Sequence, residues 1–288
     1  MPFLALLAVS LIAYFLVFSM AAWLGRRRPA TAPPVVVEEA VRAGEAARRH
    51  AGLRAFVARR LDPGGVTGLV LTLAFGAAIG FGVVLAIVTY LVRATTEVEA
   101  IDEGAAEWAH DHATGWSTDA LHVVTDVGDP DTAIALALVL GVVAIAVMRD
   151  RWVVPFLLCV VGGNALITTT VKELADRARP AIDPVAATLG PSFPSGHSSY
   201  SAAFFAAAAL VLGRRLGTWG RAALGGAAAA LAVAVASSRV LLDVHWVSDV
   251  VAGLALGWSW FAICAIAFGG RLLRFGAPAE AMRRAAAS

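Results

Sequence analysis

Charged residues are scarce in this chain: they make up 15% of its 288 residues, whereas hydrophobic residues make up 59%. Soluble globular domains carry about 25% charged residues, so the composition argues against a soluble enzyme with one buried core. The chain has two cysteines, Cys159 and Cys264, both inside long apolar runs, which excludes a disulfide-stapled scaffold. A formal net charge of +2 is too small to indicate binding to nucleic acid. The composition that remains is that of an integral membrane protein.

Long apolar segments are abundant, and seven of them approach the length of a membrane span. A bilayer core about 30 Å thick requires about 20 apolar residues in a helix. Backbone groups in lipid must be satisfied internally, and no alternating ten-residue pattern indicates a barrel. We therefore predict an all-α fold, a polytopic helical membrane protein, with spans at about residues 3–24, 66–92, 132–148, 152–171, 197–213, 222–238 and 247–268.

The sequence around these spans divides the chain into four parts. Residues 1–24 are predicted to be an uncleaved N-terminal anchor, since a cleaved signal peptide would have a basic start and a shorter apolar run. Residues 25–64 contain a Pro/Ala linker and an Arg-rich amphipathic helix, which either lies on the anionic cytoplasmic leaflet or is a solvated arm that enforces topology. Residues 65–268 are predicted to form a six-helix domain, and residues 269–288 a cytoplasmic tail.

Basic residues are divided unequally between the two sides that seven alternating spans define. Eighteen of the 23 fall on one side, in the segment before the second span, in two turns and in the C-terminal tail. The other side holds five, together with ten acidic residues between Glu97 and Asp131. Because cytoplasmic loops carry the excess of Lys and Arg, we predict a multi-pass protein of the cell membrane with its N-terminus outside and its C-terminus cytoplasmic.

The outer loop at residues 94–130 is acidic but contains Trp108 and Trp116, and aromatic residues prefer the membrane interface. We expect a helix there that lies over the membrane surface and could cover a site. Some of its side chains could bind a metal, although scattered residues on a solvated loop are the favoured interpretation: His110, His112, Asp126 and Asp129.

Two pairs of glycines spaced four residues apart fall inside the predicted spans, Gly76/Gly80 and Gly253/Gly257. Such spacing lets two helices approach closely, although it is weak evidence in spans rich in small residues. We expect close helix packing at both pairs.

Three polar clusters lie at the outer ends of predicted spans, in a topology that follows from the basic residues of the loops without reference to these motifs. Residues 172–180 end the fourth span, residues 194–197 open the fifth, and residues 238–249 connect the sixth to the seventh. The first cluster includes Lys172, the only lysine beside 22 arginines. Charges at the membrane edge are costly and usually functional, so we expect the three clusters to form one site.

The first property of this site is an affinity for anions. Lys172, Arg179 and Arg239 supply three cations, and Ser195 and the Gly196 amide lie at a predicted helix N-terminus, where exposed amides favour negative charge. Three fixed cations suit a group with two or three negative charges, and arginine binds phosphate oxygens in a bidentate manner. Phosphate is therefore favoured over carboxylate, and phosphoryl transfer depends mostly on such charge stabilisation.

The second property is nucleophilic and acid–base chemistry. His245 and Asp249 are four residues apart, so on a helical turn they share a face. The carboxylate can hold one imidazole nitrogen protonated and leave the other free to attack phosphorus, and His197 could protonate the leaving alkoxide. Asp243 is two residues from His245, which is the wrong face of a helix, so Asp249 is preferred as its partner.

Each feature also has a plainer interpretation. Ser195 could be only a helix cap, and the cations could be interfacial anchors. The pair His245/Asp249 could be a structural hydrogen bond or half of a metal site, but zinc would require a further His or Cys ligand, and the outer side has no cysteine. The plainer interpretations together would require eight compatible groups to reach one membrane depth by accident.

The order of these residues resembles the complete signature of the type 2 phosphatidic acid phosphatase (PAP2) family, over about residues 65–268. The resemblance implies that His245 is a nucleophile that forms a phosphohistidine, that Asp249 orients it, and that His197 is first the acid and then the base. It implies no metal and no other cofactor. It also implies a phosphate cradle of Lys172, Arg179, Ser195, Gly196, Ser238 and Arg239.

The function that follows is a phosphatase for a lipid phosphate or lipid diphosphate at the extracytoplasmic leaflet. Phosphatidic acid, phosphatidylglycerol phosphate and undecaprenyl diphosphate all fit, and the predicted partners are this lipid and the bilayer. A phosphotransferase of the same family is a close alternative. A haloperoxidase is possible in principle, but the spans and the expected access of lipid from the outer side argue against it. A lipid-phosphate binder or transporter without catalysis would use the cations but has no need of the arrangement of His197, His245 and Asp249. The oligomeric state is not indicated.

Overall fold

The computed structural model describes residues 2–26, 66–180 and 190–272, and within these ranges the secondary structure is helical throughout, as predicted. The elements are α1 (Pro2–Arg26), α4 (Val66–Ala94), α5 (Thr96–Asp111), α6 (Gly115–Asp126), α7 (Pro130–Val143), the π-helical turn η1 (Ala144–Met148), α8 (Val153–Ala175), α9 (Gly196–Gly213), α10 (Thr218–Leu241) and α11 (Val247–Leu272).

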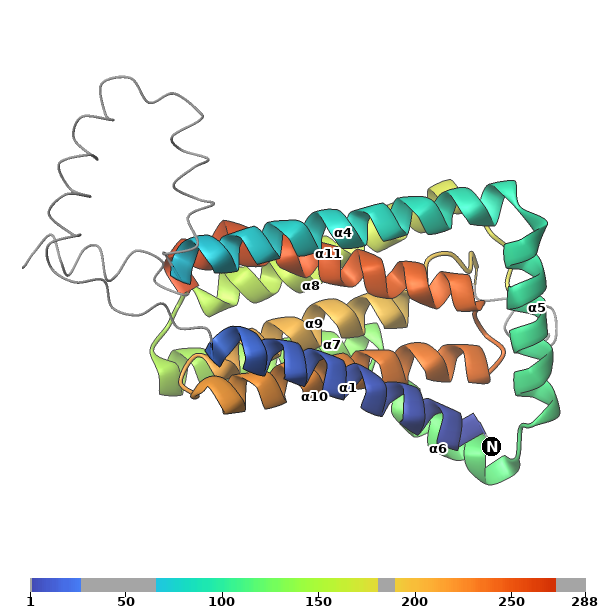
Figure 1. Ribbon diagram of the computed structural model, residues 1–288, viewed down its shortest axis with the longest axis horizontal. Coiled ribbons are helices and arrows are strands. Elements are labelled where there is room, and N and C mark those ends of the chain that lie inside the picture. The colour runs from blue at the N-terminus through green and yellow to red at the C-terminus, as the bar shows by residue number, and fades with distance from the viewer. Residues whose placement is uncertain (1, 27–65, 181–189, 273–288) are drawn as a thin grey trace, which may run out of the picture.

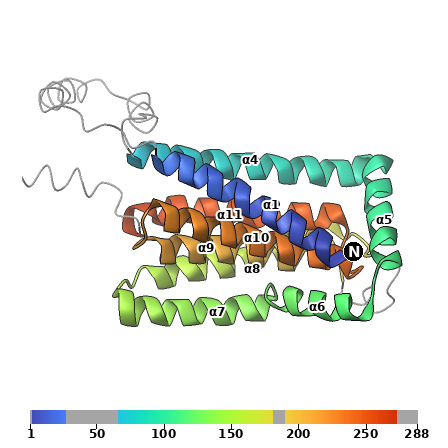
Figure 2. The ribbon, with the colours of Figure 1, turned by 60° about the horizontal axis from the view of Figure 1, so that its bottom comes forward.

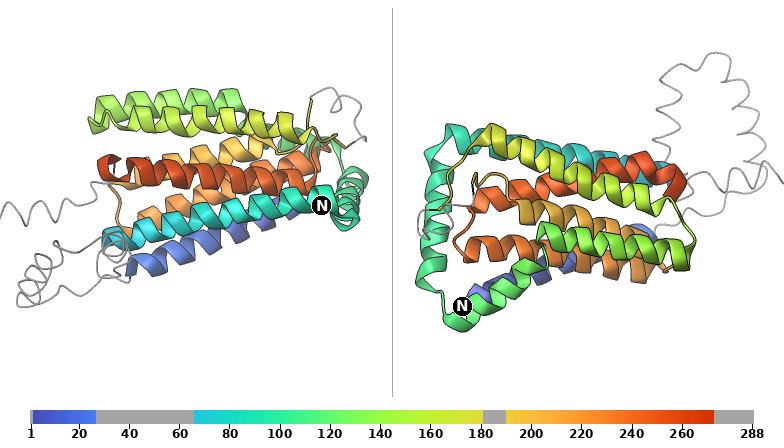
Figure 3. Two further views of the ribbon diagram at one scale, coloured as in Figure 1. Left: turned by 90° about the horizontal axis from the view of Figure 1, so that it is seen from above. Right: turned by 180° about the vertical axis from the view of Figure 1, so that it is seen from behind.

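The long helices run side by side in a bundle, and α5 lies across one end of it (Figure 1). That end, here called the α5 end, also carries the N-terminus and the turn between α10 and α11. The turns that join α7 to α8 and α9 to α10 lie at the opposite end, as further views show (Figures 2 and 3). The chain therefore alternates in direction as the sequence predicted, and it brings the polar ends of α8, α9, α10 and α11 together.

Six of the described helices are long and apolar enough to cross a membrane: Pro2–Trp23, Ala74–Ala94, Pro130–Met148, Val153–Ala175, Thr218–Leu241 and Val247–Phe268. They match six of the seven predicted spans, so the protein is a multi-span membrane protein. The remaining predicted span, at residues 197–213, corresponds to α9, which has the predicted position but begins with a polar turn. It packs against α8, α10 and α11, and Ser199 donates to Asn164 Oδ1 over 2.7 Å. Protein contacts rather than lipid thus satisfy these polar groups.

The predicted surface helix at residues 94–130 is in fact two helices, α5 and α6. A capping box of Thr114 and Ser117 starts α6, and Asp129 caps α7 by accepting a hydrogen bond from the Asp131 amide over 2.9 Å. His110 pairs with Asp243 over 3.5 Å rather than with its neighbours in the loop. Within the described ranges, no three His, Cys, Asp or Glu side chains gather closely enough to hold a metal ion.

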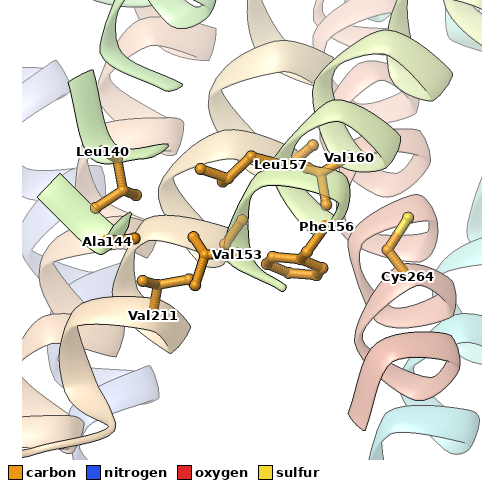
Figure 4. Close-up of a cluster of buried hydrophobic side chains, with 10 residues drawn as sticks. Leu140, Ala144, Val153, Phe156, Leu157, Val160, Val211 and Cys264 are labelled. Atoms are coloured by element: carbon orange, nitrogen blue, oxygen red, sulfur yellow. The ribbon is translucent and has the colours of Figure 1, made fainter. Parts of the chain in front are cut away.

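A cluster of buried apolar side chains joins α7, η1, α8, α9 and α11 in the half of the bundle opposite the α5 end (Figure 4). Phe156 and Val160 of α8 are completely buried and pack among residues of the neighbouring helices. In a bilayer, the lipid tails are as apolar as leucine, so such clusters stabilise the bundle through close packing rather than through removal from water. Apolar side chains elsewhere face outward, in particular on α1 and α4, as expected where lipid covers them.

The two glycine pairs behave differently. A Cβ atom on Gly257 would collide with the carbonyl oxygen of Ser199, and one on Gly253 with that of Ser195, so α11 and α9 are in backbone contact there, as predicted. Among the described residues, no atom lies within 4 Å of the corresponding positions at Gly76 and Gly80, so the expected close packing is absent from that pair in the described part of the chain. Where α4 meets α11, large side chains lie between the backbones, with the Phe81 and Trp258 ring centroids 5.2 Å apart.

Helix α1 packs along α10 and also contacts α6. Tyr14 lies against the backbone of Gly226, where no Cβ atom would fit. The Arg-rich arm, for which the sequence left two alternatives, lies outside the described residues, and so does most of the predicted tail at residues 269–288.

Candidate active site

The first wall of the site is built where α8 ends. Asp176 adopts a left-handed conformation, with φ of 44°, and its amide donates to the Lys172 carbonyl over 3.0 Å. This conformation stops the helix and turns the chain across the α5 end of the bundle. Ser192 then joins the next segment to this one, since its amide donates to Arg177 O over 2.8 Å and its hydroxyl to Ala178 O over 2.9 Å.

The second wall is the start of α9. Ser195 caps the helix: its Oγ accepts from the Ser198 amide at 3.5 Å and from the Ser198 hydroxyl at 3.0 Å. Its own amide donates to the Asp249 carbonyl over 3.0 Å, which joins the starts of α9 and α11. At Gly196, a Cβ atom would meet no atom of the described residues within 4 Å, so they leave space beside the first residue of the helix.

The third wall is the turn between α10 and α11. Asp243 is left-handed, with φ of 54°, and the His245 amide donates to Arg239 O over 3.2 Å. His245 precedes α11, whereas Asp249 lies in its first turn. Asp249 Oδ2 nevertheless accepts the Trp246 amide at 3.0 Å and lies 3.3 Å from His245 Nδ1, so the predicted pair forms although only one member is helical.

The His245 ring is 2% exposed and in contact with charged groups at both nitrogens. With Nδ1 facing Asp249, the hydrogen bonds assign the proton to Nδ1 and a lone pair to Nε2. Nε2 lies 3.2 Å from Nη1 of Arg179. Burial lowers the pKa of His245 to about 4, although the hydrogen bond that the ring donates to Asp249 acts in the opposite direction. The ring is therefore neutral at pH 7, as a nucleophile must be.

The three cations are held by neutral groups. Lys172 Nζ donates to Pro191 O over 2.7 Å, and Arg179 donates through Nε to Gly190 O over 2.9 Å and through Nη1 to Val244 O over 2.7 Å. Burial lowers the pKa of Arg179, against the attraction of Asp249, although a guanidinium remains charged at neutral pH. Arg239 Nη1 donates to Thr125 Oγ1 over 3.0 Å.

One donor of Arg239 is left over. Its Nε is buried and has no hydrogen-bond partner in the described part of the chain. Buried donors are almost always paired, so this group fits an acceptor oxygen supplied from outside the protein. None of the three cations forms an ion pair with a carboxylate among the described residues. Their positive charge therefore stays available to an anion.

His197 follows Gly196 in α9 and lies within reach of the charges of Lys172, Arg179, Arg239 and His245. Its Nε2 is 3.5 Å from Oδ2 of Asp129, the residue that caps α7. From the sequence, Asp129 was expected to be an acid on a solvated loop, with a metal ligand as the alternative. The structure makes it the carboxylate partner of this histidine.

The structure brings every predicted site residue to the α5 end, but it gives Ser238 a different environment. Ser238 is completely buried, and its hydroxyl donates to Val235 O of its own helix over 2.7 Å. Two further residues, Arg177 and Asp102, were not assigned to the site from the sequence. Arg177 Nη1 donates to Asp249 Oδ1 over 2.7 Å, and its Nη2 donates to Asp102 Oδ2 over 2.8 Å.

The fold is that of a helical membrane protein, and these clusters gather cations and two histidines at one end of it. Residues 152–272 match the PAP2 superfamily. Phosphatidylglycerophosphatase B of Bacillus subtilis is 30% identical over 165 residues, which are 57% of this chain and 81% of that protein. The chain therefore belongs to the PAP2 superfamily.

Two further relatives and one solved structure agree. Decaprenylphosphoryl-5-phosphoribose phosphatase of Mycobacterium tuberculosis is 34% identical over 46% of this chain and 70% of its own length. Lipid A 1-phosphatase of Rhizobium etli is 34% identical over 39% of this chain and 48% of its own length. The crystal structure of a transmembrane PAP2 type phosphatidylglycerolphosphate phosphatase from Bacillus subtilis superposes with a TM-score of 0.63 at 26% identity and covers 69% of this chain and 98% of that one. The chain is a phosphoric ester hydrolase that acts on lipid phosphates.

Proposed function

We propose that this enzyme hydrolyses a lipid phosphate or lipid diphosphate through a phosphohistidine formed on His245, at the extracytoplasmic face of the membrane. The observation that carries the proposal is the environment of the His245 ring. Asp249 holds Nδ1 at 3.3 Å, and Nε2 lies 3.2 Å from a guanidinium that can bind the phosphate under attack.

In the first step, the Nε2 lone pair of His245 attacks phosphorus while the bond from phosphorus to the lipid oxygen breaks. His197 gives its proton to that oxygen, so the lipid leaves as a neutral alcohol, or as a monophosphate when the substrate is a diphosphate. Lys172, Arg179 and Arg239 stabilise the charge on the three other phosphate oxygens. Asp249 stabilises the positive charge that the imidazole gains when the N–P bond forms.

In the second step, His197 is neutral and accepts a proton from water. The water oxygen attacks phosphorus, the N–P bond breaks, and its electron pair returns to Nε2 of His245. Inorganic phosphate leaves, and His197 is protonated again for the next cycle. Burial and the charges of Arg239, Lys172 and Arg179 oppose the protonated ring of His197, so the groups that favour it in this step are Asp129 at 3.5 Å and the bound phosphate.

The distribution of arginines supports the outer face. The turns at the end of the bundle opposite the site carry Arg149, Arg151, Arg214, Arg215 and Arg221. Since such residues accumulate on the cytoplasmic side, we place the α5 end outside. We also propose that residues 65–268 contain the whole catalytic apparatus and that α1 is an additional anchor.

The substrate class is a lipid whose phosphate lies at the depth where α8 and α10 end and where α9 and α11 begin. The names of the relatives include a phosphatidylglycerophosphatase, a lipid A 1-phosphatase and a decaprenylphosphoryl-5-phosphoribose phosphatase. We propose a test panel of these three types with phosphatidic acid and undecaprenyl diphosphate.

The test is phosphate release by the purified full chain in detergent with EDTA, beside His245→Ala. His112→Ala is the matched control, because His112 is an exposed histidine at the same end of the bundle. A labelled substrate quenched in alkali should leave label on the wild type and on the control but not on His245→Ala, since phosphohistidine survives alkali. Phosphate transferred to an added alcohol instead of water would indicate a phosphotransferase, and retained lipid binding without turnover in the wild type would indicate a binder.

A further inference from the structure

Arg177 lies between two buried carboxylates that come from distant parts of the chain. Nη1 donates to Asp249 Oδ1 over 2.7 Å, and Nη2 donates to Asp102 Oδ2 over 2.8 Å. Asp249 is completely buried and Asp102 is 2% exposed, whereas the Arg177 side chain is 18% exposed. Buried carboxylates are stable when they are both paired and hydrogen-bonded, and one guanidinium supplies both conditions here.

Asp102 also holds the start of α11. Its Oδ1 accepts the Ser248 amide at 2.9 Å, and its Oδ2 accepts the Ser248 hydroxyl. The first amides of a helix have no acceptor within the helix, and Asp102 of α5 supplies the acceptor for the Ser248 amide. The carboxylate thereby joins the helix that lies across the end of the bundle to the turn that carries Asp249.

The Arg177 guanidinium is held on its other side as well. Its Cζ lies 5.5 Å from the centroid of the Trp246 ring, and the Trp246 indole donates to Ala178 O over 2.9 Å. Among the described residues, the side-chain hydrogen bonds of Arg177 go to Asp102, Ser248 and Asp249. Arg177 thus differs from Lys172, Arg179 and Arg239, because its charge is committed to carboxylates and is not available to a phosphate.

We propose that Asp102 and Arg177 are positioning residues for the reaction, which fix the orientation and the charge of Asp249 so that it holds the Nδ1 proton of His245. The inference rests on the proposed role of His245. Asp249 contacts His245 through one carboxylate oxygen and Arg177 through the other, so movement of the guanidinium changes the bond on which the nucleophile depends.

Loss of Arg177 has a defined electrostatic direction. The groups whose charges face His245 are Asp249 of α11, Arg179 of the 176–180 segment, Arg239 of α10 and His197 of α9. Without the Arg177 cation, the charge of Asp249 is no longer balanced, so the protonated ring of His245 becomes more favourable. The pKa of His245 should therefore rise, and a smaller fraction of the enzyme should carry a free nucleophile near neutral pH.

The experiment compares Arg177→Gln and Asp102→Asn in the full-length protein in detergent, with the best lipid of the panel. Each should lower kcat by roughly 10-fold or more, the scale for outer partners of site residues. KM and the inhibition constant of inorganic phosphate should stay within about 2-fold, because the phosphate-binding cations are untouched. For Arg177→Gln, the acid limb of the pH profile should move to higher pH. The double variant should be no slower than the slower single one, since the two residues act as a unit.

The matched controls remove similar groups outside this network. Arg93→Gln removes an exposed arginine that donates to Leu174 O over 2.9 Å, and Glu103→Gln changes the exposed neighbour of Asp102. Both should keep wild-type kcat. Arg177→Lys keeps the charge without the two-sided geometry and should leave the acid limb in place while kcat falls. Circular dichroism and gel filtration establish folding, and if Arg177→Gln does not fold, the same criteria apply to Arg177→Lys and Asp102→Asn.

A titration of His245 by NMR, assigned by its absence in His245→Ala, separates this inference from the proposed function. A rise of the His245 pKa in Arg177→Gln supports the network even if the wild type hydrolyses nothing in the panel, in which case the proposed function alone fails. The inference is overturned by wild-type kcat in folded Arg177 and Asp102 variants. It is equally overturned if KM and phosphate inhibition change while kcat does not, or if the two substitutions act independently.

Discussion

His245 and Asp249 form a pair across the boundary between a turn and a helix: Nδ1 of His245 lies 3.3 Å from Oδ2 of Asp249, and only Asp249 belongs to α11. The same carboxylate oxygen accepts the Trp246 amide at 3.0 Å. Asp249 thus supports the turn and the histidine with one group. A substitution at Asp249 should affect both the shape of the turn and the nucleophile.

Replacement of the nucleophile gives the first prediction. His245→Ala should lower kcat by roughly 10²-fold or more, since it removes the atom that attacks phosphorus. Inorganic phosphate should still bind, because Lys172, Arg179 and Arg239 remain in place. Stopped assays of phosphate release and calorimetric titration with phosphate measure the two quantities. A kcat near that of the wild type would contradict the assigned role.

The second prediction concerns the proton donor. His197→Ala should lower kcat on alkyl lipid phosphates by roughly 10²-fold. An aryl phosphate has a leaving group that needs no proton, so this variant should release one equivalent of the phenol rapidly and then turn over slowly, because the second step lacks its base. Rapid-mixing absorbance measurements show this burst. Equal losses on both substrates, without a burst, would argue against proton donation by His197.

The titration of His245 gives the third prediction. Since burial lowers its pKa to about 4, the ring should stay neutral as the pH falls from 7 to 5 and become protonated only as the pH falls through about 4. Asp249→Asn removes the group that favours the proton and should lower this pKa further. Arg179→Gln removes a repelling cation and should raise it. NMR of labelled histidines measures all three, and an unperturbed titration in the wild type would show that the ring is not buried.

The fourth prediction concerns the cation at the end of α8. Lys172→Ala should lower kcat/KM by roughly 10²-fold, because it removes charge stabilisation of the transition state. Lys172→Arg should restore the activity only in part, since a guanidinium is a planar fork and an ammonium is a compact charge. Arg215→Ala, at the opposite end of the bundle, is the control and should behave as the wild type. An unchanged kcat/KM in Lys172→Ala would exclude this residue from the phosphate cradle.

Close contact between helices gives the fifth prediction. Gly257→Ala places a methyl group against Ser199 O, so it should push α11 from α9 and reduce stability by about 1–3 kcal/mol. Gly76→Ala meets open space and, since alanine favours a helix, should leave stability equal or higher. Thermal unfolding in detergent, followed with kcat, compares the two. If both variants melt alike, the glycine contact is not stabilising.

The position of the candidate site residues could be predicted from the sequence because their spacing is local. His245 and Asp249 are four residues apart, and Lys172 and Arg179 lie in one short segment at the end of a span. Their common location also follows from sequence, since alternate spans place it at one end of the bundle. The membrane helices were predictable because apolar length is a direct consequence of bilayer thickness.

Contacts between distant segments could not be predicted in this way. The pair of Arg177 and Asp102 joins residues 75 positions apart, and it depends on how α5 crosses the end of the bundle. Asp102 is one of ten acids in its region of the sequence, so its burial had no local signal. Likewise, the spacing of Gly76 and Gly80 matches that of Gly253 and Gly257, and only the position of the neighbouring helix distinguishes them.

The cations of the site are held by carbonyl and hydroxyl oxygens, and this arrangement has a consequence for the enzyme in use. No carboxylate of the described residues has to be displaced from Lys172, Arg179 or Arg239 when an anion arrives, so inorganic phosphate, the product, meets the same attraction as the substrate. Compact divalent oxyanions such as sulfate should compete as well. The rate in a given medium then depends on the local concentration of free phosphate, and the lipid gains its advantage from being confined to the membrane plane.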